Sequence, residues 1–222
     1  MPSLRTLSIC TEHVPAKITD PILEVLLASL VLSSLSSFEL SCGLPSSSGT
    51  GYYSWPSSLL TILQHSSATL RYMSLHLDSR NSSKASWGRL SVLLKTIPHI
   101  SHLHLKDSVT EKAGSNQQSS SWDDLIVTFL SDLADVGSGN PILPDLTHLT
   151  LTNINVTPGI KNAVVATAAL RIPSRLSVVG NDVRALEELW VMPCYAEPPS
   201  PDVLEVIAEL KRDGVNVLFK SA

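Results

Sequence analysis

The sequence predicts an α/β solenoid, in which parallel strands form one curved sheet and helices cover its convex side. A six-residue pattern recurs six times along the 222 residues: apolar, two variable residues, apolar, one variable residue, apolar. Segments with helical periodicity lie between the copies. The copies begin at residues 4, 35, 70, 100, 146 and 186, so each step leaves room for one strand and one helix. We expect residues 1–222 to form a single irregular domain of about six repeats.

Each copy of the pattern is predicted to be a strand with one buried face. The fourth and sixth residues are apolar in every copy, and side chains two residues apart point to the same face of a strand. The copies are 4–9, 35–40, 70–75, 100–105, 146–151 and 186–191.

Helices are predicted between the strands, in chain order at 22–30, 59–63, 90–97, 125–133, 159–170 and 203–210. The pair Asp20-Pro21 favours a helix start, with aspartate as N-cap and proline at the first helical position. Gly214 favours a helix end and precedes a final strand at 215–219. Strands that alternate with helices are joined by right-handed crossovers and therefore lie parallel. Polar Ser/Gly-rich stretches at 45–51, 78–86, 114–121 and 137–144 are predicted to be loops or partly disordered insertions.

Composition excludes several classes of protein. A hydrophobic share of 43% excludes a disordered chain, and a net charge of −4 argues against a nucleic-acid partner. The most apolar stretch, 22–35, contains Glu24 and is shorter than the roughly 20 residues of a membrane span, so no membrane partner is expected. No signal peptide is recognised at the start, and three cysteines without metal-ligand spacing fit a reducing compartment. We therefore expect a cytoplasmic or nuclear protein.

The six copies resemble leucine-rich repeats. The proline in Pro2-Ser3-Leu4 and Pro144-Asp145-Leu146, the uneven repeat lengths, the Ser-rich loops and the closing element 210–217 are similar to the leucine-rich-repeat regions of fungal F-box proteins. This resemblance implies a protein–protein interaction module that recognises substrates of a ubiquitin ligase. The chain contains no recognisable F-box, so a Skp-type adaptor is an expected partner only if an F-box lies upstream. We expect the first copy to lack the N-terminal cap that a terminal repeat normally needs.

Counted from the first residue of each copy, the third, fifth and seventh residues are predicted to face away from the helices. His102 and His148 fall at the third position of two successive copies, and His76 and His104 fall nearby. We expect these residues to contact an unknown protein ligand on the concave side of the sheet: Tyr72, His76, His102, His104, His148, Glu188 and Trp190. Two alternatives are an inert solvated face and a metal site that gathers three imidazoles. Clustered histidines also predict binding that changes between about pH 5.5 and 7.

Motifs of catalysis are missing from the sequence. It contains no GxxxxGK[ST], GxGxxG, GxSxG or HExxH. We therefore expect neither enzymatic activity nor a cofactor. The alternative is a small α/β hydrolase in which the repeated pattern is accidental.

Overall fold

The computed structural model describes residues 4–10, 21–28, 30, 32–43, 57–78, 84–107, 120–137, 141–154, 157–173, 176, 183–193 and 201–219. Strands and helices alternate through these residues. The strands are β1 (Thr6–Cys10), β2 (Ser37–Gly43), β3 (Tyr72–Asp78), β4 (His102–Asp107), β5 (His148–Ile154), β6 (Glu188–Pro193) and β7 (Asn216–Phe219). The helices are α1 (Pro21–Ala28), α2 (Ser57–Ser66), α3 (Lys84–Lys95), α4 (Ser120–Ala134), α5 (Pro158–Leu170) and α7 (Pro201–Arg212).

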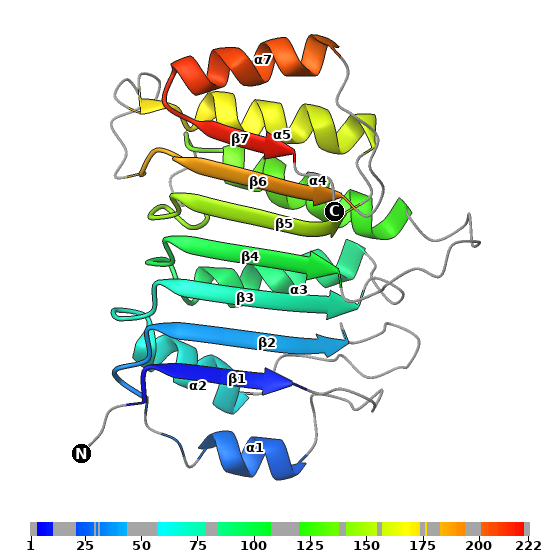
Figure 1. Ribbon diagram of the computed structural model, residues 1–222. Helices are drawn as coiled ribbons and strands as arrows, with labels where there is room; N and C mark the ends of the chain where they lie inside the picture. The colour runs from blue at the N-terminus through cyan, green and yellow to red at the C-terminus, as the bar shows by residue number, and fades with distance from the viewer. Residues whose placement is uncertain are drawn as a thin grey trace.

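The seven strands form one sheet in chain order, β1-β2-β3-β4-β5-β6-β7, and every described pair is parallel. Figure 1 shows the sheet in front of the helices, so the helices cover one of its faces. The opposite side, which we name the open face, carries no helix in the described part of the chain. The α/β fold of alternating strand–helix units that the pattern predicts is confirmed.

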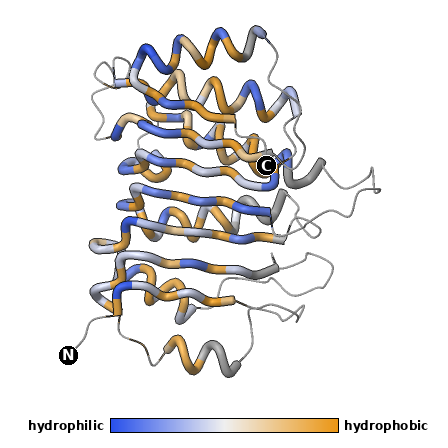
Figure 2. Tube along the Cα trace, viewed as in Figure 1, coloured by the Kyte–Doolittle hydropathy of each residue, from blue (hydrophilic) through white to orange (hydrophobic). Residues whose placement is uncertain are grey.

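The core lies between the sheet and the helices because the strands alternate in polarity. In β4, Leu103 and Leu105 are buried, whereas His102 and His104 point to the open face. The same alternation colours the strands in Figure 2. The equivalent residues of β1, Leu7 and Ile9, are only half-buried, so the first unit is less completely covered than its successors. No helix among the described residues is both long and apolar enough to cross a bilayer.

A backbone staircase joins successive units where each strand begins. The carbonyl at the second position of one copy accepts two N–H groups from the next copy, at 2.8 to 3.1 Å. These carbonyls belong to Arg5, Ser36, Arg71, Ser101 and Thr147. The hydroxyls of Ser36, Ser101 and Thr147 also donate to the preceding carbonyl of the staircase, at 3.1 to 3.2 Å. Serine or threonine at the second position therefore ties one repeat to the one before it.

Several boundaries differ from expectation. Helix α3 begins at Lys84 and α4 at Ser120, so both take residues from stretches predicted to be loops. Short polar residues are acceptable in a first helical turn, where backbone N–H groups lack helical partners. The predicted loop at 45–51 and the expected N-cap Asp20 lie outside the described residues. Gly214 ends α7 as predicted, with φ +93°, and its N–H donates to the Lys211 carbonyl.

Arg171, the residue that directly follows α5, is a buried cation. Arg171 is 0% exposed, and its guanidinium donates to the carbonyls of Ile142, Leu143 and Leu146 at 3.0 to 3.3 Å. Its own carbonyl accepts from the Leu186 N–H at 3.0 Å. Arg171 therefore joins the segments that lead into β5 and β6. Burial lowers the pKa of Arg171 to about 10, which leaves the guanidinium charged at neutral pH.

Candidate functional site

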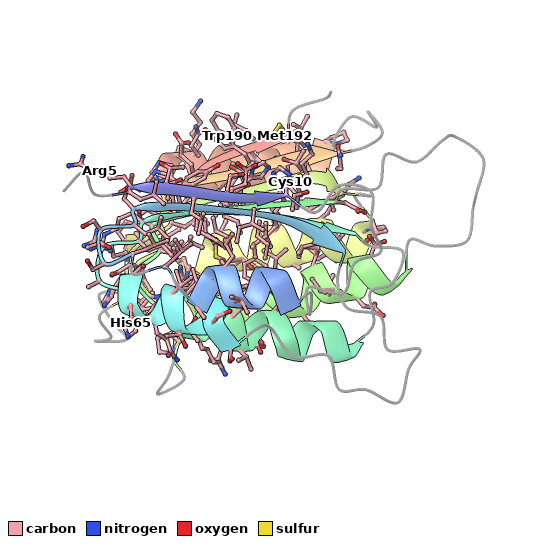
Figure 3. All side chains as sticks on the ribbon, turned by 90° about the horizontal axis from the view of Figure 1, so that it is seen from below. Arg5, Cys10, His65, Trp190 and Met192 are labelled. Atoms are coloured by element: carbon pink, nitrogen blue, oxygen red, sulfur yellow. The ribbon has the colours of Figure 1, made fainter. Side chains whose placement is uncertain are left out.

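The parallel register builds two adjacent rows of side chains on the open face. The outer row runs Tyr72, His102, His148 and Glu188 across β3 to β6. The inner row, two residues further along the same strands, runs Ser74, His104, Thr150 and Trp190. Neighbouring strands lie about 4.8 Å apart, so each row brings distant repeats into side-chain contact. Figure 3 shows Trp190 on the side of the sheet away from the helices, whereas His65 of α2 lies on the helical side.

A pocket of about 180 Å³ lies between these rows. The lining includes six of the seven residues that the sequence singles out as partner contacts: Tyr72, His102, His104, His148, Glu188 and Trp190. Leu103, Leu149 and Thr150 complete the lining. The seventh predicted residue, His76, belongs to the same face but does not line the pocket. The structure therefore gathers most of the predicted set into one hollow.

His102 and His148 stack in the outer wall of the pocket. Their ring centroids are 4.2 Å apart and the planes differ by 12°, which confirms that the two histidines lie side by side. Burial lowers the pKa of His102, the neighbouring His148 lowers it further, and Glu187 and Glu188 oppose the shift. The two rings therefore resist being charged together.

The hydroxyls before these histidines hold the rings in place. His102 Nδ1 lies 2.9 Å from Ser101 Oγ, and His148 Nδ1 lies 2.8 Å from Thr147 Oγ1. Both hydroxyls already donate their single proton to staircase carbonyls. Both contacts of each hydroxyl are satisfied together when its oxygen accepts from Nδ1–H, and on this ground we assign the Nδ1–H tautomer to both neutral rings. Nε2 of each ring is consequently an unprotonated acceptor.

A chain of polar contacts runs beside the pocket from β2 to β5. His76 Nε2 lies 3.5 Å from Glu39 Oε1 and 3.1 Å from Ser74 Oγ. Ser74 Oγ also lies 3.3 Å from His104 Nδ1, and His104 Nε2 lies 2.8 Å from Thr152 Oγ1. Burial is the largest cause that lowers the pKa of both His76 and His104. Lys106 adds to both shifts, His76 adds to that of His104, and Glu39 opposes them.

Two open-face residues differ from the expected exposure. Ser74 is only 2% exposed, because His76 and His104 flank its hydroxyl. Trp190 is half-buried, and its indole Nε1 is buried without a hydrogen-bond partner among the described residues. The indole is therefore part of the pocket wall rather than a freely exposed contact.

The geometry of the described residues bears on the two alternatives, a hydrolytic site and a metal site. Ser74 and Glu39 both approach Nε2 of His76, whereas a hydrolytic triad needs carboxylate and hydroxyl on opposite ring nitrogens. No group of three or more His, Cys, Asp or Glu side chains in this part of the chain is placed to hold a metal ion.

Sequence reasoning did not single out Ser101 and Thr147, although they orient the stacked pair. The signal was present, because both occupy the variable second position of a copy and precede a histidine at the third. The repetitive parallel β-α architecture therefore sets which residues of neighbouring strands lie side by side in the site. No protein-family model, curated protein or solved structure matches the chain.

Proposed function

We propose that this chain is a protein-binding module that recognises a polypeptide partner on the open face of its sheet. The observation that carries the proposal is the pocket over β3 to β6, where aromatic rings and imidazoles from four repeats converge. Such side chains offer large contact areas at low cost in conformational entropy and are common at the centres of interfaces.

The resemblance of the repeats to leucine-rich repeats of fungal F-box proteins supports a narrower proposal. In it, the open face is the substrate-recognition region of an F-box-type ubiquitin ligase subunit. A Skp-type adaptor would then bind an F-box upstream of residue 1, and the partner on the open face would be the substrate.

A displayed library of random dodecapeptides tests the protein-binding proposal. We expect the wild-type chain to enrich defined sequences, and the variant His102→Ala/His148→Ala/Trp190→Ala to lose them. The control His65→Ala/Val92→Ala/Leu204→Ala removes exposed side chains from the helical side and should retain the same peptides. Circular dichroism must show that both variants keep the wild-type spectrum. Enrichment that the open-face variant retains, or no enrichment by the wild type, would contradict the proposal.

A further inference from the structure

The outer row of the pocket on the open face presents three groups that can accept hydrogen bonds, the His102 and His148 rings and the Glu188 carboxylate. The Nδ1–H tautomers leave Nε2 of His102 and of His148 as acceptors, because the neighbouring hydroxyls use their protons elsewhere. Glu188 adds a carboxylate, and its Oε2 lies 4.0 Å from His148 Nε2. Two acceptors at this separation form no hydrogen bond with each other, so a donor placed near both would satisfy them. His104 offers no free donor, since both of its ring nitrogens already contact hydroxyls.

The charge of the pocket points to the same kind of ligand. Glu188 is the one acidic side chain among the lining residues, and no lysine or arginine lines the pocket. Glu187 precedes it and acts on His102 with the same sign. Burial lowers the pKa of His102 and of His104 below the ordinary histidine value of about 6.5, so these imidazoles are mainly neutral at pH 7.5. A cationic group would therefore meet a negative carboxylate and neutral rings.

The shape of the wall favours a planar cation. The His102–His148 stack, Tyr72 and Trp190 surround the hollow with flat rings. A guanidinium is planar, carries five N–H donors and no acceptor, and stacks on aromatic faces. An ammonium is a compact, strongly hydrated charge that uses such walls less well.

We infer that this pocket binds the guanidinium of an arginine side chain, which the polypeptide partner of the proposed function presents. In this arrangement the guanidinium lies between the two rows, donates to Glu188 and to the Nε2 acceptors in the planes of the imidazoles, and stacks on the indole of Trp190. The inference rests on the proposed function and deepens it by naming the side chain that the pocket selects.

Acidification should release this ligand, because protonated imidazoles would repel it. Charged and titratable groups on each neighbouring strand face the imidazoles of the wall. They are Glu39 on β2, Tyr72 and His76 on β3, Lys106 on β4, and Glu187 and Glu188 at β6. Histidine is the residue type among these whose ordinary pKa lies between pH 5.5 and 7.5, so we attribute the change in that range to the imidazoles.

The test is a titration of the ¹⁵N-labelled full chain with four blocked pentapeptides, followed by NMR. The peptides are acetyl-Gly-Ser-Xaa-Ser-Gly-amide, with arginine, lysine, citrulline or glutamate as Xaa. Citrulline keeps the shape of arginine without its charge. At pH 7.5 we expect the arginine peptide to shift signals of the pocket residues and to bind about fivefold more tightly than the citrulline peptide. At pH 5.5 we expect its affinity to fall by about tenfold.

Two variants separate a pocket effect from a general charge effect. Glu188→Gln removes the pocket carboxylate and should weaken the arginine peptide about fivefold while leaving the citrulline peptide unchanged. Glu209→Gln removes an exposed carboxylate of α7 and should leave both affinities unchanged. Equal binding of all four peptides in the pocket would overturn the arginine inference but leave the protein-binding proposal standing. Preference for the glutamate peptide, or no shift of pocket signals by any peptide, would also overturn the inference. The displayed library decides the proposed function independently.

Discussion

The variant Arg171→Met tests how the fold holds the two strands that form half of the pocket. Methionine fills most of the space of the arginine side chain but donates no hydrogen bond. The change removes three donations from the guanidinium, to the carbonyls of Ile142, Leu143 and Leu146. The Leu143 carbonyl keeps the N–H of Leu146 at 3.1 Å, whereas the Ile142 and Leu146 carbonyls have no other donor among the described residues.

Two opposing terms set the magnitude. Hydrogen bonds from a charged donor contribute about 1.5 to 3 kcal/mol each, so three of them contribute about 4.5 to 9 kcal/mol. Burial works in the other direction, because it lowers the pKa of Arg171 from 12.5 to about 10. That depression corresponds to about 3 kcal/mol against the charged form. We therefore expect Arg171→Met to lower the free energy of unfolding by about 3 kcal/mol, which is about 6 to 12 °C in Tm for a chain of this size.

Urea denaturation followed by circular dichroism measures this change, with unchanged m values as the check on two-state behaviour. Arg184→Met is the matched control, because Arg184 is 65% exposed and pairs with Asp145 at the surface. That control should change the free energy of unfolding by less than about 0.5 kcal/mol. If Arg171→Met is as stable as the wild type, the buried guanidinium costs as much as its hydrogen bonds contribute, and the argument for its structural role is wrong.

Four further predictions concern stability and the site. Burial lowers the pKa of His76 and His104, so the unfolded chain takes up protons at a higher pH than the folded chain. The free energy of unfolding should then fall as pH drops below about 6.5, and in His76→Gln/His104→Gln it should fall less, as urea titrations at several pH values will show. Burial raises the pKa of Asp123 to about 6, and Asp124 and Asp107 add to the shift. Ionising this buried carboxyl costs free energy, so the folded state becomes less stable as pH rises through that value. Asp123→Asn should therefore unfold at higher urea than the wild type at pH 7.5, and the difference should shrink toward pH 4. Gly214→Ala should cost about 1 kcal/mol in the same assay, because φ +93° strains any residue with a Cβ even though the space around it is open. Long-range ¹⁵N–¹H spectra at pH 7.5 should show the Nδ1–H tautomer for His102 and His148, and Nε2–H signals for either ring would refute the assignment of acceptors.

The strand register is the part of the site that the sequence predicts well. Counting within the repeated pattern pairs His102 with His148 and places Glu188 beside them, and the structure has these pairs. Register follows from the pattern because a shift by one residue would turn every buried leucine outward. The seventh strand is predicted differently, from Gly214 as the end of a helix and the stretch 215–219 after it, and β7 lies there.

The burial and the hydrogen-bond partners of individual side chains are harder to predict from the sequence. Alternation along a strand predicts the face to which Ser74 and Trp190 point, but neighbouring side chains decide that one is buried and the other half-buried. Arg171 follows a helix in the sequence like any surface arginine, and only the segment 142–146 folded over it explains its burial.

The sequence by itself determined the alternation of strands and helices, the parallel order of the sheet and the residues on its open face. It could do so because the periods of strands and helices are properties of the local backbone. Tertiary structure decided which hydroxyl donates to which carbonyl, and thereby which nitrogen of His102 and His148 is left as an acceptor. These contacts join residues about one repeat apart, such as Thr147 with Ser101, and their geometry exists only when the repeats are stacked.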